Sequence, residues 1–266
     1  LSAALADQVA PDDVVVVHDP QPAGAGALLR RDHGVPAIWR SHIGLDRRTP
    51  ETEAGWAFLR PWLEAYDRTV FTIGAYAPAY LEDAEIARPG IDPLSHKNRE
   101  LSIHKHAGIL VNASLSSTVH PAVSPPFEDP ALRLQEDGSF APATQPEGLG
   151  LMFRPVLTQV SRWDRLKGFG PLLEGFARLK RKAVDDGRDR AERHRRRLEL
   201  ARLVLAGPDP EAVDDDPEGQ EVFSDLCDRW LELPPDLRRD VAIVRLPMES
   251  RKVNALMVNV LQRSSV

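Results

Sequence analysis

The stretch LTQVSRWDRLKG, residues 157–168, places an apolar run directly before a polar turn that carries Arg162 and Lys167. Beyond Gly168, apolar residues recur at the three-and-four spacing of an amphipathic helix that packs on a sheet. They are Phe169, Leu172, Leu173, Phe176 and Leu179. The pattern therefore predicts a strand, a loop and a helix. Ligands of open α/β sheets bind beyond the carboxyl ends of the strands, so we expect this loop to face a substrate crevice.

Two cations in this loop indicate an anionic ligand. Arg162 offers a planar fork of donors and Lys167 a compact charge, a pairing that suits a diphosphate. The start of the following helix, with its free amides and its dipole, also favours negative charge. The residues alone leave a second interpretation open, in which both are solvated loop cations, because exposure is the default for Lys and Arg.

The same rhythm of strand, loop and helix recurs along the chain, which predicts a doubly wound α/β fold. The β-branched run VVVVH (residues 14–18) predicts a parallel strand that is buried on both faces. Between residues 119 and 150, a Pro-, Ser- and Gly-rich stretch with few large apolar residues is expected to form an extended loop. This stretch divides the chain into a first domain, residues 1–118, and a second domain, residues 151–266.

Histidines follow the first two predicted strands. His18 and Asp19 stand at the end of the first strand, and Arg40 and His42 stand at the end of the second. A histidine in such a place either binds a ligand or makes a structural hydrogen bond, and the residues alone leave both interpretations open.

The composition favours small-molecule ligands. A net charge of -6 and a pI near 5.8 argue against a nucleic-acid binder. Acidic residues interrupt the Arg-rich segment 178–200, which we interpret as a solvated surface helix or insertion. Cys227 is the single cysteine, which excludes an intrachain disulfide and favours a cytoplasmic setting. We find no apolar run of about 20 residues and no signal peptide, so no membrane association is expected.

Six stretches resemble, in the same order along the chain, the retaining GT-B glycosyltransferases of family 4, and specifically their trehalose synthase branch. They are VVVVHDPQP (residues 14–22), WRSHIGL (39–45), GIDPLSHKN (90–98), SRWDRLKG (161–168), DDPEG (215–219) and RKVNA (251–255). Ordered matches over almost the whole chain are far more specific than any single motif.

The resemblance implies two Rossmann-type domains that face a cleft, with a nucleotide-sugar donor on the second domain and a sugar acceptor on the first. It implies transfer of glucose from UDP-glucose or ADP-glucose to glucose, which forms trehalose with retention. Arg162 and Lys167 would bind the donor diphosphate, and His42 would act in catalysis. His18, Asp19 and Arg40 would lie on the acceptor side. Because two cations neutralise the diphosphate, neither a metal ion nor another cofactor is expected.

Two other functions stay open, as does homo-oligomerisation. Another family 4 transferase, forming sucrose or a glycan, would share donor recognition but not acceptor recognition. A non-catalytic nucleotide-sugar-binding fragment is the alternative outside the enzymes, since the chain starts at Leu1 and stops at Val266, where an apolar strand begins. We therefore expect both domains to be incomplete, this chain alone to be inactive, and the strand 241–247 to have an unpaired edge.

Overall fold

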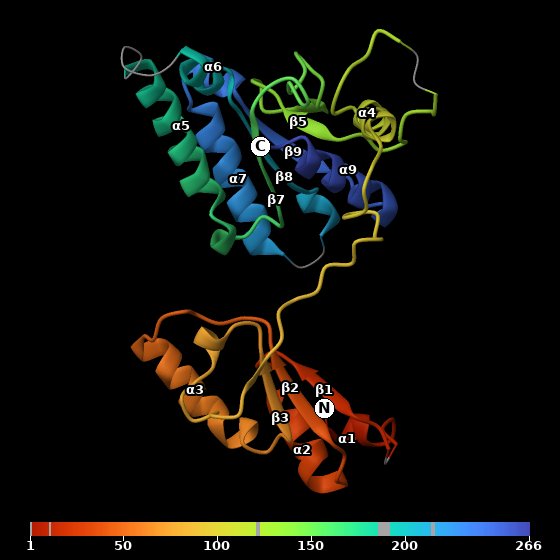
Figure 1. Cartoon of the computed structure of the whole chain (residues 1–266), viewed down its shortest axis with the longest axis vertical. Helices are drawn as coiled ribbons and strands as arrows, with labels where there is room; N and C mark the ends of the chain where they lie inside the picture. The colour runs from red at the N-terminus through yellow and green to blue at the C-terminus, as the bar shows by residue number, and fades with distance from the viewer. Residues whose placement is uncertain (1, 11, 121–122, 186–191, 214–215) are drawn as a thin grey trace. The chain divides into compact units, whose positions relative to one another are not determined.

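The computed structural model describes residues 2–10, 12–120, 123–185, 192–213 and 216–266. Contacts divide the chain into two compact units, residues 1–91 and 92–266, which Figure 1 colours from red to blue along the chain. Across the described residues, no helix combines the length and the apolar composition that a membrane span requires.

The first unit contains a parallel sheet of order β1-β2-β3-β4. Its strands are β1 (Val15–His18), β2 (Ala37–Ser41), β3 (Arg68–Phe71) and β4 (Glu85–Ile86). Its helices are α1 (Ser2–Ala6), α2 (Ala23–His33), α3 (Pro50–Leu63) and the short η1 (Gly74–Tyr76). Because β1 and β2 are adjacent and parallel, their carboxyl ends lie side by side.

Burial of β1 differs from the expectation. The predicted parallel strand is confirmed, but Val14 and Val16 are 57% and 48% exposed, and only Val17 is buried. The sheet order gives the reason, since β1 is an outer strand of the four. The central strand β2 instead carries the core of the unit, where Trp39 packs against Phe71.

The second unit contains a five-stranded sheet of order β6-β5-β9-β8-β7. Its strands are β5 (Leu132–Leu134), β6 (Phe140–Pro142), β7 (Val156–Val160), β8 (Arg202–Pro208) and β9 (Val241–Leu246). Its helices are α4 (Ile103–Asn112), η2 (Arg165–Lys167), α5 (Phe169–Asp185), α6 (Glu192–Leu200), η3 (Pro210–Ala212), α7 (Pro217–Leu231), α8 (Pro235–Arg239) and α9 (Arg251–Arg263).

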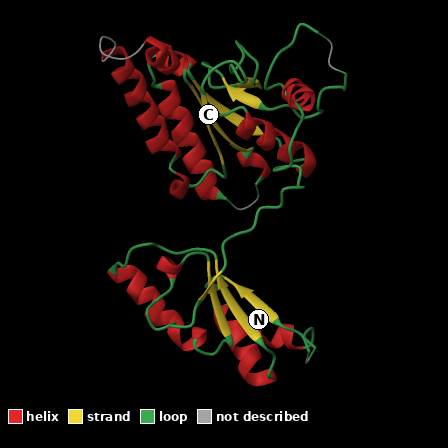
Figure 2. Ribbon diagram, viewed as in Figure 1, coloured by secondary structure: helices red, strands yellow, loops and turns green. Residues whose placement is uncertain are grey.

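Helices cover both faces of this second sheet, as Figure 2 shows. Alternate residues of β8 enter two different cores. Val204 packs with residues of α4 and α9 on one face, and Leu205 packs with residues of α5 and α7 on the other. The strands β7, β8 and β9 are parallel, so the predicted doubly wound α/β class is confirmed.

The expected domain boundaries are wrong, because residues 92–150 belong to the second unit. Helix α4 packs against α9, so the first domain does not extend to residue 118. Within the expected loop 119–150, β5 and β6 form a hairpin that pairs antiparallel with β9. The alanines that flank it, Ala131 and Ala143, are fully buried. Strands of three residues are too short to show an alternating apolar pattern in the sequence, and the many turn-forming residues around them favoured a loop.

The same hairpin corrects the expectation of an unpaired edge beside residues 241–247. Strand β9 lies between β5 and β8, so both of its edges are paired. The Arg-rich segment contributes the end of α5 and the helix α6, whose described side chains are largely exposed. The predicted solvated surface helix is therefore observed there, while residues 186–191 of that segment lie outside the described residues.

Candidate functional site

Two histidines meet at the carboxyl edge of the first sheet. His18 ends β1, and His42 follows the last residue of β2. Their rings are nearly parallel, with centroids 5.0 Å apart and an interplanar angle of 14°. Nδ1 of His18 lies 2.7 Å from Nε2 of His42, and both side chains are exposed. A hydrogen bond needs one N–H and one lone pair, so one of these two nitrogens donates and the other accepts.

Asp19 links the segments that follow β1 and β2. Its carboxylate Oδ1 accepts the backbone N–H of His42 at 2.8 Å, and its own N–H donates to the Arg40 carbonyl at 2.9 Å. Its carbonyl accepts the indole N–H of the buried Trp39 at 2.9 Å. Asp19 has a φ of 65°, a left-handed conformation that Asp tolerates better than most residues. These bonds place His42 beside His18.

The Arg40 side chain makes different contacts from the two histidines. It is half-buried on β2, and its Nη2 donates to the Ala87 carbonyl at 3.0 Å. The printed contacts therefore tie Arg40 to the segment after β4, and no hydrogen bond joins it to His18 or His42 among the described residues. The structure thus places all four residues at one edge of the sheet, where Arg40 is the register partner of His18, but the Arg40 side chain is tied to Ala87 and not to the other three.

The loop 161–168 of the second unit is anchored by its tryptophan. Trp163 is buried, and its indole N–H donates to the Pro208 carbonyl at 2.7 Å. Its ring packs on Phe169 and Phe223, with centroids 4.8 Å away in each case. A Cβ on Gly207 would lie 2.5 Å from the Trp163 ring, so only glycine lets the end of β8 approach this closely.

The remaining residues of the loop start helix α5. Asp164 accepts the N–H of Leu166 at 2.7 Å and so caps η2. Gly168 adopts a φ of 69°, which turns the chain from η2 into α5. The predicted strand, loop and helix are confirmed here.

Arg162 and Lys167 differ from the arginine between them. Both are exposed, and neither side chain makes a hydrogen bond or an ion pair with any residue of the described ranges. Arg165, in contrast, lies 3.0 Å from the carboxylate of Glu221 and 3.9 Å from that of Glu218. The two cations that the sequence selected are therefore available to an anion, and the third is already neutralised.

A hollow of about 520 Å³ lies beside this loop, between the start of α5 and one side of α7. Its cations are Arg165 and Arg229, and each is paired with carboxylates, Arg229 with Asp225 at 2.9 Å and Glu174 at 3.2 Å. Arg162 and Lys167 lie outside the lining of this hollow and face the open surface of the loop.

The sequence analysis missed a charged pair at the same edge of the second sheet. Asp209 follows β8 and forms an ion pair with Arg245 of β9. The guanidinium of Arg245 also lies 4.8 Å from the centroid of the Phe140 ring. An aspartate directly after a buried strand was the signal available for Asp209, but the pairing depends on strand register, which the sequence does not display.

Comparisons with known proteins show that the chain is similar to trehalose synthases. Residues 2–78 match the model of the trehalose synthase N-terminal domain. The chain is 29% identical over 252 residues to trehalose synthase from Pyrococcus horikoshii, which covers 91% of this chain and 44% of that protein. It is 40% identical over 106 residues to trehalose synthase from Rubrobacter xylanophilus, which covers 37% of this chain and 24% of that protein. The chain thus spans less than half the length of the Pyrococcus horikoshii protein.

The fold resembles a solved α,α-trehalose-phosphate synthase (UDP-forming) from Burkholderia vietnamiensis. The TM-score is 0.60 at 18% identity, with 99% of this chain and 54% of that chain covered. The predicted resemblance to GT-B proteins of the trehalose synthase type is therefore confirmed.

Proposed function

We propose that this chain carries donor-binding and acceptor-binding parts of a retaining glycosyltransferase, which transfers glucose from UDP-glucose or ADP-glucose to glucose and forms trehalose. The observation that carries the proposal is the pair Arg162 and Lys167, two cations without a side-chain partner in the described part of a chain that is similar to a trehalose synthase along 91% of its length. Such cations lie where α/β sheets bind ligands, at the carboxyl end of β7.

The donor diphosphate would lie across the start of α5. Arg162 would bind it through paired guanidinium N–H groups and Lys167 as a point charge, while the first amides of α5 add donors. As the bond between the glucose C1 and the phosphate oxygen breaks, negative charge grows on the diphosphate, and both cations stabilise it. This arrangement needs no metal ion. The UDP-forming activity in the name of the Burkholderia vietnamiensis neighbour supports a nucleoside diphosphate as the leaving group.

His42 would act on the transition state, and His18 would shape the acceptor side. In the transfer, the acceptor hydroxyl loses its proton, the new C1–O bond forms, and the departing diphosphate takes up a proton, so the reaction balances without another reactant. Because Nε2 of His42 contacts His18, its Nδ1 is the nitrogen left for the sugar or the diphosphate. Asp19 would hold His42 in place through its backbone N–H, and Arg40 would contribute to the acceptor side.

The 266 residues by themselves are proposed to bind the donor without turning it over, since they correspond to 44% of the Pyrococcus horikoshii protein. The test assays this chain beside a version extended to the length of that relative, with UDP-glucose or ADP-glucose and a panel of acceptors. We expect trehalose, with retained anomeric configuration, from the extended version only. Sucrose or a glycan as the product would show that the acceptor is not glucose. Saturable UDP binding without turnover in both versions would show that the protein binds nucleotide sugars without catalysis.

A further inference from the structure

A second hollow, of about 620 Å³, lies in the second unit at the edge opposite the loop 161–168. Its walls come from β5, from the turn between β5 and β6, from the end of α7, and from α8. Helix α8 runs directly into the start of β9, so this is the amino edge of that strand. Arg162, by contrast, follows the carboxyl end of β7. The two places are therefore distinct.

Arg133 of β5 lines this hollow and has an unusual environment. It is only 4% exposed. Its Nη1 donates to the Glu147 carbonyl at 3.2 Å, but its buried Nε has no hydrogen-bond partner among the residues that the structure describes. Within the described ranges, no carboxylate lies within 4 Å of its guanidinium. Burial lowers the pKa of Arg133 from its usual value, the nearby Arg202 lowers it further, and the more distant Glu147 carboxylate offsets part of this effect. A buried guanidinium that contacts no carboxylate directly destabilises a fold, so a compensating function is expected.

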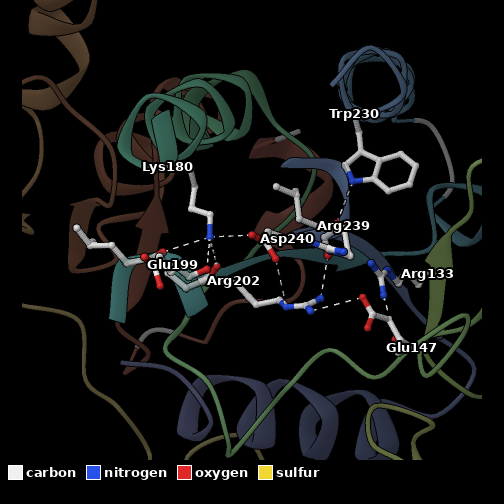
Figure 3. A network of polar contacts seen from close by, with 11 residues as sticks. Arg133, Glu147, Lys180, Glu199, Arg202, Trp230, Arg239 and Asp240 are labelled. Carbon is white, nitrogen blue, oxygen red and sulfur yellow. Dashed lines mark hydrogen bonds and ion pairs between the residues drawn. The ribbon is translucent and has the colours of Figure 1, made fainter. Parts of the chain in front are cut away.

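The neighbouring carboxylates are engaged by other cations, as Figure 3 shows. Asp240 lies 2.7 Å from Nζ of Lys180 and 3.6 Å from Nε of Arg202. The Glu147 carboxylate, which is half exposed, lies 3.5 Å from Nη2 of Arg202. Three cations, the buried Arg133 and Arg202 and the largely buried Lys180, thus lie near two carboxylates, and both carboxylates pair with Lys180 or Arg202. The cluster has an excess of one positive charge, and Arg133 is the member that faces the hollow.

The mouth of the hollow adds groups of both signs. Arg239 is exposed there, and its side chain makes no hydrogen bond or ion pair with the described part of the chain. Arg238 stacks on Trp230, with its guanidinium 5.7 Å from the ring centroid, and pairs with the exposed Glu136 at 3.3 Å. Asp137 is also exposed in the same turn. Guanidinium groups bind phosphate oxygens, and carboxylates accept hydroxyl hydrogens.

We propose that this hollow binds a hydroxylated phosphate monoester, with its phosphate on Arg133 and Arg239 and its hydroxyls on Glu136 and Asp137. The phosphate supplies the negative charge that the cluster lacks. The volume of about 620 Å³ suits a small metabolite. The site is separate from the proposed donor site, so it stands or falls independently of sugar transfer.

Calorimetric titration of the 266-residue chain tests the proposal with ribose 5-phosphate, inorganic phosphate and ribose. We expect ribose 5-phosphate to bind most tightly, phosphate more weakly, and ribose not at all. Arg133→Gln should weaken ribose 5-phosphate binding about tenfold or more, as expected for the loss of charge-assisted hydrogen bonds in a desolvated site. Arg239→Gln, at an exposed position that should not disturb folding, should weaken it by about threefold.

The double variant Arg162→Ala/Lys167→Ala is the matched control, because it removes the cations of the other edge. We expect it to bind ribose 5-phosphate as the unaltered chain does. Loss of binding in this control, unchanged binding in Arg239→Gln, or no binding of ribose 5-phosphate to the unaltered chain would each overturn the proposal. Circular dichroism of Arg133→Gln shows whether it folds, and Arg239→Gln decides the question if it does not.

Discussion

At the carboxyl edge of the second sheet, Arg162 and Lys167 are exposed and have no ion-pair partner in the described ranges, whereas at the amino edge Lys180 and Arg202 are buried against Asp240. Exposed cations keep their hydration and cost the fold little, so they are free to bind a ligand. Buried cations have lost that hydration and depend on their counter-ion. The same residue types therefore have a proposed binding role at one edge, whereas Lys180 and Arg202 have a structural role at the other.

The largest expected effect is a loss of stability when the ion pairs at the amino edge of the second sheet are removed. Asp240→Ala should lower the free energy of unfolding by about 3 to 5 kcal/mol, because it leaves Lys180 and Arg202 buried without their shared carboxylate. Urea denaturation measures it. Arg162→Ala is the control and should change stability by no more than about 0.5 kcal/mol. Similar stabilities for the two variants would contradict the distinction between the edges.

The second prediction concerns the first sheet, where the histidine pair is also exposed. His42→Ala, made in a protein extended to the length of the Pyrococcus horikoshii relative, should lower turnover by about 10²- to 10³-fold, the range for one donor to a developing charge. The Michaelis constant for the donor should change far less. Steady-state kinetics separate the two. Normal turnover with only a raised Michaelis constant would assign His42 to ground-state binding.

The third prediction concerns Gly207, where the carboxyl end of β8 packs closely against the buried Trp163. Gly207→Ala should lower the free energy of unfolding by about 1 to 3 kcal/mol, because the new Cβ would lie 2.5 Å from Trp163 and force overpacking. Gly175→Ala in α5 is the control, since nothing lies within 4 Å of a Cβ there. That variant should be neutral or more stable by up to about 1 kcal/mol. Equal effects in thermal melts would show that the close approach is unimportant.

The smallest expected effect depends on pH. His106 of α4 is buried, and its Nε2 lies 2.9 Å from the Ser264 hydroxyl at the end of α9. Burial first, and Arg263 second, lower the pKa of His106 below its usual 6.5. Below that value the unfolded chain binds a proton that the folded chain resists, so this contribution to stability is complete above pH 6.5 and is lost as the pH falls below it.

His106→Gln should therefore flatten the decline of stability between neutral and mildly acidic pH. Melting temperatures across that range check the variant, and an equally steep decline in His106→Gln would contradict the assignment.

The sequence predicted the repeating units of the fold because their signals are local. The apolar run before Arg162 and the helical spacing after Gly168 lie within a few residues of each other, and β7, η2 and α5 follow them. The hairpin of β5 and β6 has no such signal. Its place in the second unit depends on pairing with β9, more than a hundred residues later.

The candidate site shows the same limit. That His18 and His42 end neighbouring strands is visible in the sequence, because each stands after a short apolar run. Their 2.7 Å contact, the support from Asp19 and the diversion of Arg40 toward Ala87 depend on loop geometry and register. Likewise, sequence alone did not separate Arg165, which Glu221 neutralises, from the two free cations beside it.

The central claim, that the carboxyl edge of the second sheet binds a nucleoside diphosphate, is tested most directly by calorimetric titration of the 266-residue chain with UDP and ADP. We expect Arg162→Ala and Lys167→Ala each to weaken binding by about 1.5 to 3 kcal/mol, the range for a hydrogen bond to a charged group. Arg165→Ala, which removes the paired cation of the same loop, should leave the affinity close to that of the unaltered chain. Unchanged affinity for both nucleotides in Arg162→Ala and Lys167→Ala would contradict the account.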